Sequence, residues 1–209
     1  TATEEYRNRV IQLGEQPERV FNVGAVGIDN INRLTLMPFD EFERSINFKL
    51  GKKNLLVTFH PVTLENSTSK EQFANLLEVL VSLDETHIIF TKPNADTDGR
   101  IISQMVDSYV ADNSETSVSF NSMGQLRYLY ALTYVDAVVG NSSSGLIEAP
   151  SFHIGTVNIG DRQRGRISAD SVINCDSSEN GIKEAIVKIY SSSFQNILST
   201  VENPYGKGG

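Results

Sequence analysis

The stretch that decides the fold of this chain is Val138-Val139-Gly140-Asn141-Ser142-Ser143-Ser144-Gly145-Leu146-Ile147-Glu148. An apolar run stops at Gly140-Asn141, three serines follow, and an apolar stretch with a single glutamate comes next. Valine favours strands, glycine and asparagine favour turns, and serine favours the start of a helix. The stretch therefore predicts a strand, a tight turn and a helix in succession.

A junction of this kind favours a bound anion. The first turn of a helix leaves its backbone N–H groups without intrahelical partners, and the peptide dipoles add about half a positive charge there. Ser142, Ser143 and Ser144 add hydroxyl donors, and phosphate binds such a turn readily. Glu148 would repel phosphate, but its paired oxygens suit the two hydroxyls of a ribose. These features predict a nucleotide, and the alternative is a serine cap with a solvated glutamate.

The composition limits the class of protein. A chain of 209 residues with 39% hydrophobic content can bury one substantial core or two small ones. It has no long apolar run and no signal-peptide pattern, so we expect no membrane segment. The single Cys175 and the three histidines argue against a disulfide and a structural zinc site, which suits a cytoplasmic protein without a metal. The net charge of -8 argues against a nucleic-acid partner.

Expected strands and helices alternate along most of the chain. Strands are expected at 19–23, 54–59, 87–91, 117–120, 137–139, 156–159 and 171–174. Helices are expected at 3–14, 70–83, 98–110, 123–133 and 179–190, and two more begin at 24–27 and near 40. Such alternation indicates α/β class, a Rossmann-like doubly wound parallel sheet in a single domain over 1–209. We expect the tail at 203–209 to be mobile.

The carboxyl ends of parallel strands meet at one edge of a sheet, and ligands bind just beyond that edge. The segments that follow the expected central strands are His60-Pro61, Lys92-Pro93-Asn94, Asn121-Ser122-Met123, the serine turn, and Asp161-Arg162-Gln163-Arg164-Gly165-Arg166. We therefore expect a histidine, an asparagine, the serines and a cluster of arginines along the same rim.

Three of these segments also have a plainer interpretation. Arg162 or Arg166 suits a diphosphate, because guanidinium groups bind phosphate bidentately, and the alternative is a solvated loop with surface ion pairs. His60, held extended by Pro61, suits a phosphate or a reacting sugar, whereas a lone histidine often only packs. Asn94 is either a ligand contact or a turn former.

The expected helix at 123–133 brings aromatic residues near the rim. The backbone near Met123 or the ring of Tyr128 or Tyr130 suits a nucleobase, and core packing is the alternative for at least one tyrosine. His87 and His153 lie outside the rim, so we expect both to be structural.

Four motifs together resemble those of the hydrolysing UDP-N-acetylglucosamine 2-epimerases of sialic-acid and legionaminic-acid synthesis. They are Thr58-Phe59-His60-Pro61-Val62-Thr63, Pro93-Asn94-Ala95-Asp96, Gly140-Asn141-Ser142-Ser143-Ser144-Gly145 with Glu148, and Asn158-Ile159-Gly160-Asp161-Arg162-Gln163-Arg164-Gly165-Arg166. The motifs occur in the order and spacing of that family, and the resemblance covers essentially the whole chain.

The resemblance implies a glycosyltransferase-B-like fold of two domains, of which this chain is the C-terminal half. Residues 1–18 would then lead from an N-terminal domain, and 191–209 would form a C-terminal helix and tail. By resemblance, UDP contacts His60, Asn94, Met123, Tyr128, Ser142, Ser143, Ser144, Glu148, Arg162 and Arg166. His60 is also the one catalytic candidate within the chain.

The implied reaction removes the proton at C2 of the sugar and expels UDP. Water then adds with inverted configuration at C2, giving UDP and free N-acetylmannosamine or a related sugar without a cofactor. The main acids of the family belong to the N-terminal domain, so this chain alone is expected to be inactive, and a homodimer is expected at full length. Two alternatives stay open: a non-hydrolysing epimerase or glycosyltransferase of the same fold, and a non-catalytic module that binds a nucleotide sugar.

Overall fold

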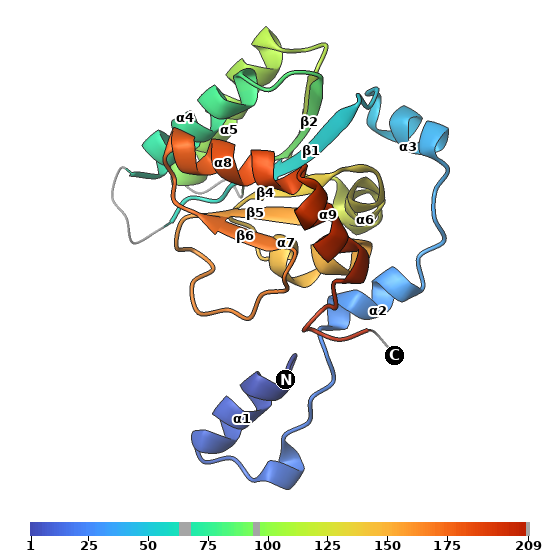
Figure 1. Cartoon of the computed structure of the whole chain (residues 1–209), viewed down its shortest axis with the longest axis vertical. Coiled ribbons are helices and arrows are strands. Elements are labelled where there is room, and N and C mark those ends of the chain that lie inside the picture. Colours follow the sequence, from blue (N-terminus) through green and yellow to red (C-terminus); the bar gives the residue numbers. More distant parts are fainter. Residues whose placement is uncertain (63–67, 94–96, 208–209) are drawn as a thin grey trace.

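A single parallel sheet organises the chain (Figure 1). The computed structural model describes residues 1–62, 68–93 and 97–207. Within these ranges the strands are β1 Lys53–Thr58, β2 Thr86–Thr91, β3 Ser117–Phe120, β4 Ala137–Gly140, β5 Gly155–Ile159 and β6 Val172–Cys175. Their order is β3-β2-β1-β4-β5-β6, and every neighbouring pair is parallel. The predicted α/β class and doubly wound parallel sheet are confirmed.

Helices connect the strands. They are α1 Glu4–Gln12, α2 Val26–Asn32, α3 Phe39–Ile46, α4 Thr68–Val81, α5 Thr97–Asp112, α6 Gly124–Tyr134, α7 Ser144–Ile147, α8 Glu179–Ile189 and α9 Ser192–Thr200, with 3-10 turns at Pro17–Arg19 and Ala149–Phe152. The side chains of Thr3, Ser178 and Ser191 accept a backbone N–H at the starts of α1, α8 and α9. Among the described residues, no helix has the length and apolar character needed to cross a membrane.

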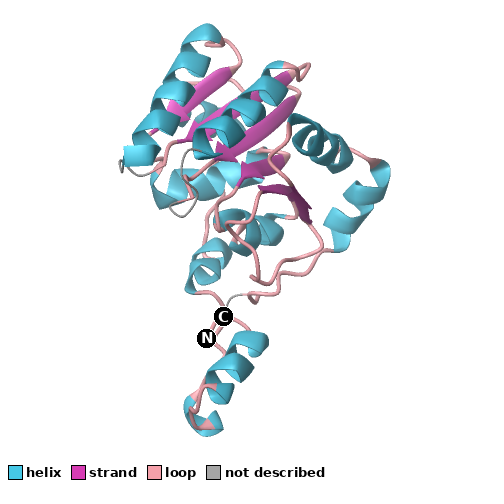
Figure 2. Cartoon of the chain, turned by 90° about the vertical axis from the view of Figure 1, so that its left-hand side faces the viewer, coloured by secondary structure: helices cyan, strands magenta, loops and turns pink. Residues whose placement is uncertain are grey.

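The sheet is covered on both faces because successive residues of a strand point in opposite directions. Leu55 and Val57 pack in a core formed with α4, α5, α8 and α9, whereas Leu56 packs in a second core with α3 and α6. Figure 2 shows helices on either side of the strands. Burial of each such leucine contributes about 2 kcal/mol to stability, so both faces are needed for the fold.

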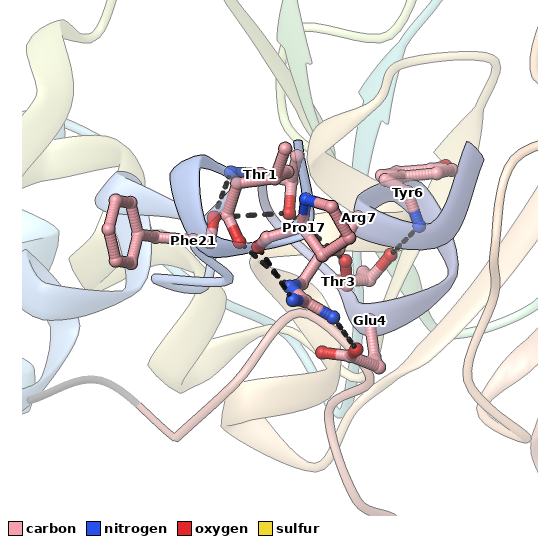
Figure 3. A network of polar contacts seen from close by, with 8 residues as sticks. Thr1, Thr3, Glu4, Tyr6, Arg7, Pro17 and Phe21 are labelled. Carbon is pink, nitrogen blue, oxygen red and sulfur yellow. Dashed lines mark hydrogen bonds and ion pairs between the residues drawn. The ribbon is translucent and has the colours of Figure 1, made fainter. Parts of the chain in front are cut away.

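Residues 1–25, here called the N-terminal arm, lie apart from the sheet (Figures 1 and 2). The guanidinium of Arg7 holds the arm together: it donates to the carbonyls of Val20 at 2.7 Å and Pro17 at 2.9 Å, and it pairs with Glu4 at 3.0 Å (Figure 3). The predicted strand at 19–23 is wrong, because Arg19 ends a 3-10 turn and no described strand pairs with the segment that follows.

The C-terminal tail, which the sequence predicts to be mobile, packs against the rest of the chain over residues 203–207. Asn203 Nδ2 donates to the carbonyl of Ile147 at 2.8 Å. The side chain of Tyr205 is only 2% exposed, and its carbonyl accepts the Ala25 N–H at 2.8 Å. The tail therefore crosses the base of the N-terminal arm.

Candidate functional site

The candidate site lies where the strand order reverses, between β1 and β4. The two strands pair in register, with Thr58 opposite Gly140, so the segments that follow them start side by side. His60 follows β1, and the serine turn follows β4. In open α/β sheets, ligands bind at this topological switch point. The structure therefore brings together two of the segments that the sequence places on one rim.

Gly140 allows the two strands to approach at their ends. Its φ of +136° is in the region that favours glycine, and an added Cβ would lie 2.0 Å from the carbonyl oxygen of Thr58. The N–H of Asn141 donates to that same oxygen at 3.1 Å. A side chain at position 140 would therefore force the base of the site apart.

Asn141, which is not among the predicted site residues, connects the parts of the site. It is 1% exposed, and its side-chain amide contacts both backbone groups of His60, at 2.7 and 2.8 Å. Its carbonyl accepts from Arg162 Nη1 at 2.9 Å and from Gln163 Nε2 at 2.7 Å. Gln163, also unassigned from the sequence, is 3% exposed. An asparagine directly after the glycine that ends a buried strand was the available signal.

The serine turn leads into a short helix, α7, which packs tightly on β5. Ser143 occupies the N-cap position of α7, but its side chain makes no capping hydrogen bond, so the plain capping interpretation does not describe this serine. Ser144 Oγ lies 3.2 Å from Ser142 Oγ. A Cβ on Gly145 would lie 2.6 Å from the methyl group of Thr156, so glycine is needed for this close packing.

Tyr128 supports the serine turn through its hydroxyl, which hydrogen-bonds with Ser144 Oγ. Burial raises the pKa of Tyr128 far above its ordinary value, so the hydroxyl stays protonated. Met123 is 3% exposed and its side chain packs in the core with Leu129, so only its backbone is available to the rim. A nucleobase contact by the Tyr128 ring stays a prediction.

Tyr130, His87 and His153 have structural roles. The hydroxyl of Tyr130 donates to the carbonyl of Thr35 at 3.0 Å. His87 Nδ1 lies 2.7 Å from the carbonyl of Lys49, and His153 Nδ1 lies 3.0 Å from that of Leu198. Both histidines therefore hold backbone segments, as expected.

Glu148 is half-buried and incompletely paired. Its Oε2 atom is buried and accepts no hydrogen bond from any described residue. Burial raises the pKa of this carboxyl from 4.5 to about 7. Its Oε1 atom lies against α2, where a Cβ on Gly27 would be 3.2 Å away. An unpaired buried carboxylate oxygen is costly, and a ligand that donates hydroxyl hydrogen bonds would satisfy it.

The segment from Gly160 to Arg166 is here called the arginine loop. Its arginines lie in two different environments. Arg162 turns back to the carbonyl of Asn141, and burial, with a further effect from Arg166, lowers the pKa of its guanidinium. Arg164 is exposed and pairs loosely with Asp161 at 3.6 Å, as in the solvated alternative. Arg162 is thus tied to the rim, whereas Arg164 faces solvent.

Four residues of the motifs, Thr63, Asn94, Ala95 and Asp96, lie outside the described residues, so the predicted role of Asn94 stays a prediction. The described residues place His60, the serines, Tyr128 and Arg162 around the end of β4 through the contacts given above. Glu148 directly follows α7, and its N–H donates to the carbonyl of Ser144 at 2.9 Å.

Comparison with known proteins identifies the family. The model of the family described as UDP-N-acetylglucosamine 2-epimerase matches residues 1–209. A GDP/UDP-N,N'-diacetylbacillosamine 2-epimerase (hydrolyzing) from Campylobacter jejuni is 36% identical over 190 residues, which are 91% of this chain and 49% of that protein. Polysialic acid biosynthesis protein P7 from Escherichia coli is 38% identical over 211 residues, covering 99% of this chain and 52% of the relative. The chain thus spans about half the length of these relatives.

Solved structures support the fold. UDP-GlcNAc 2-epimerase from Methanocaldococcus jannaschii, in complex with UDP-GlcNAc and UDP, matches with a TM-score of 0.75 and 17% identity over 100% of this chain and 57% of that one. The enzyme from Neisseria meningitidis bound to UDP-GlcNAc matches with a TM-score of 0.73 and 18% identity, covering 100% of this chain and 56% of that one. At such identities the likeness concerns the fold, and the expected half of a glycosyltransferase-B-like protein is confirmed. The chain belongs to the UDP-N-acetylglucosamine 2-epimerase family.

Proposed function

We propose that this chain is the UDP-binding half of a hydrolysing UDP-sugar 2-epimerase. The observation that carries the proposal is the unpaired, buried Oε2 atom of Glu148 beside a serine turn at the switch point of the sheet. Relatives from Campylobacter jejuni and Legionella pneumophila, 36% and 34% identical, carry the description "hydrolyzing", which supports the hydrolysing branch over a non-hydrolysing epimerase or a glycosyltransferase.

In this proposal the phosphates bind at the N-terminal end of α7 and the ribose binds at its C-terminal end. The ribose hydroxyls donate to Glu148, which supplies the hydrogen bonds that its Oε2 atom lacks. The diphosphate binds the N–H groups and hydroxyls of Ser142, Ser143 and Ser144, and Arg162 compensates its charge. Secondary contacts come from Arg166, Asn94, the backbone of Met123 and the ring of Tyr128 near the uracil.

The reaction proposed for the full-length protein begins with removal of the C2 proton of the sugar. The C1–O bond then breaks, UDP leaves, and a double bond forms between C1 and C2. Addition of water places a hydroxyl on C1 and a proton on C2 from the opposite face, which inverts C2 and releases the free sugar. His60 lies beside the leaving diphosphate, and the other acids and bases come from the part of the protein outside this chain.

The first 39 residues, which include the N-terminal arm, support the existence of a second domain that adjoins them. Of the eleven large apolar side chains that are exposed among the described residues, six lie within the first 39 residues: Leu13, Phe21, Val23, Val26, Leu36 and Phe39. Such a concentration indicates a surface that another part of the protein covers. The segment at 19–23, which has a strand-like sequence and no strand partner among the described residues, is suited to join a sheet there. We further propose that the full-length protein is cytoplasmic and forms a homodimer. Gel filtration tests the oligomeric state.

Calorimetry with UDP tests the binding site on this chain. We expect wild type to bind UDP with a Kd between micromolar and millimolar, and Glu148→Ala and Ser143→Ala to weaken it at least about tenfold. Glu184→Ala is the matched control, because Glu184 is an exposed glutamate on α8 that contacts only Asn180 among the hydrogen bonds described. Absence of UDP binding to folded wild type, or equal binding by all variants, contradicts the proposal.

Product analysis of the full-length protein tests the reaction. A free 2-epimerised sugar with UDP supports the hydrolysing reaction, whereas a UDP-linked epimer or a transferred sugar supports the alternatives. In H₂¹⁸O, the released UDP is expected to carry no label, because the C1–O bond breaks in the proposed reaction and the bridging oxygen stays on UDP.

A further inference from the structure

We propose that Tyr6 and Tyr205, near opposite ends of the chain, are positioning residues that hold the arginine loop in place for the second phosphate of UDP. The inference rests on the proposed function, and it concerns residues that neither the motifs nor the comparisons assign a role. Its basis is a closed ring of hydrogen bonds around the backbone of Ile167, the residue that follows the loop.

Both backbone groups of Ile167 contact a tyrosine hydroxyl. The hydroxyl of Tyr205 donates to the Ile167 carbonyl at 2.8 Å, and the Ile167 N–H donates to the hydroxyl of Tyr6 at 3.3 Å. The two hydroxyl oxygens are 3.4 Å apart. A tyrosine hydroxyl has one proton, and that of Tyr205 is already donated, so the bond between the hydroxyls runs from Tyr6 to Tyr205. Each of the three groups in this ring then donates once and accepts once.

The ring fixes one end of the arginine loop, and Asn141 fixes the other. Arg162 and Gln163 donate to the carbonyl of Asn141 at 2.9 and 2.7 Å. Between these anchors, Arg164 and Arg166 are exposed. A short loop that is anchored at both ends presents its guanidinium groups in a narrow range of positions, which favours recognition of a diphosphate. Without the tyrosine hydroxyls, the end that carries Arg166 would keep the hydrogen bond from its own N–H to the Gln163 carbonyl, at 3.1 Å, but would lose its contacts with the arm and the tail.

The position of the two tyrosines argues for a role beyond core packing. Tyr6 lies on α1, which has no buried residue and lies apart from the sheet. Tyr205 is buried where the tail crosses the arm, and a Cβ on Gly24 would lie 3.0 Å from its carbonyl oxygen. The ring therefore joins the N-terminal arm, the C-terminal tail and the arginine loop. Because the arm adjoins the second domain in the proposed function, the loop is sensitive to the position of that domain.

Limited digestion with trypsin tests, without any ligand, whether the ring holds the arginine loop. Trypsin cleaves after arginine, and the loop contains three arginines. We expect Tyr6→Phe and Tyr205→Phe to increase the rate of cleavage after Arg164 and Arg166 about fivefold, as measured by mass spectrometry of the peptides. Tyr130→Phe is the matched control, since it removes a hydroxyl that bonds a backbone carbonyl away from the loop. Cleavage of the loop at the control rate in both variants overturns the proposal.

Nucleotide binding tests the positioning role. We expect the Kd for UDP to rise about fivefold in Tyr6→Phe and Tyr205→Phe, and the Kd for UMP, which lacks the second phosphate, to change less than twofold. Equal losses for UDP and UMP overturn the positioning role, because a general loss of structure affects both nucleotides. Failure of wild type to bind UDP contradicts the proposed function instead, and the trypsin comparison still decides whether the ring holds the loop.

Discussion

The side-chain amide of Asn141 pairs with the backbone of His60 as a neighbouring strand would. Its Oδ1 atom accepts the His60 N–H at 2.7 Å, and its Nδ2 atom donates to the His60 carbonyl at 2.8 Å. The two residues are 81 positions apart in sequence. The pairing extends the contact between β1 and β4 past the last backbone hydrogen bonds, and it fixes where the chain carrying His60 leaves the sheet.

Substitution Asn141→Asp tests this pairing. Aspartate keeps an acceptor for the His60 N–H but has no donor for the His60 carbonyl, and it places a charge at a buried position. We expect a loss of about 2–3 kcal/mol in the free energy of unfolding and at least about tenfold weaker UDP binding. Urea denaturation and calorimetry measure the two effects. Asn196→Asp, at an exposed position on α9 whose side chain takes part in none of the hydrogen bonds described, serves as the control and should change neither quantity measurably.

Glu148 is expected to make stability depend on pH. Its pKa is about 7 in the folded chain and 4.5 ordinarily, so between these values the folded state binds more protons than the unfolded state. Stability therefore falls as the pH rises from about 4.5 to 7 and is constant above, with a loss of about 2 kcal/mol after allowance for partial exposure. Urea denaturation of wild type and Glu148→Gln between pH 4 and 8 measures it. If the free energy of unfolding changes equally with pH in the two proteins, Glu148 does not cause the pH dependence.

Substitution Tyr128→Phe removes the hydroxyl that contacts Ser144. We expect a loss of about 1 kcal/mol in stability and about fivefold weaker UDP binding, because the serine turn loses one of its supports. Tyr190→Phe is the control: its hydroxyl lies 3.3 Å from Asp136, which precedes β4 at the opposite edge of the sheet. That control should lose stability and keep its affinity for UDP. Equal affinities in both variants would show that Tyr128 does not support the turn.

Substitution of two glycines with positive φ distinguishes the cost of a steric clash from the cost of backbone strain. Gly140→Ala places a Cβ 2.0 Å from the Thr58 carbonyl oxygen, whereas Gly124→Ala, at a φ of +67°, meets nothing within 4 Å. We expect Gly124→Ala to cost about 1 kcal/mol and Gly140→Ala to cost at least about 3 kcal/mol, both by chemical denaturation. Comparable costs would mean that the two strand ends can separate without penalty.

The sheet could be predicted closely because its strands have a strong local signature. The expected strand at 117–120 coincides with β3, and the others agree with β1, β2, β4, β5 and β6 to within about one residue at each end. The failure at 19–23 has a different cause. The segment has the composition of a strand, but a strand also needs a partner, and its own residues carry no information about that partner.

The candidate site was predictable to the extent that strand ends meet at one rim. His60, the serines and Arg162 follow three different strands, and topology alone brings them near one another. The connections between them were not predictable. The Asn141 contact with His60, the Tyr128 contact with Ser144 and the anchoring of Tyr205 all join residues that are far apart in sequence, so they depend on tertiary structure that no local pattern encodes.

The carbonyl of Tyr205 lies against the base of the N-terminal arm, so the chain enters and leaves its sheet at one corner (Figure 1). When the two ends of a domain lie close together, the domain can be exchanged between proteins or joined to a new neighbour without a change in the path of either chain. This corner is therefore the natural junction for building chimaeras in which the domain formed by this chain is combined with the other half of a relative.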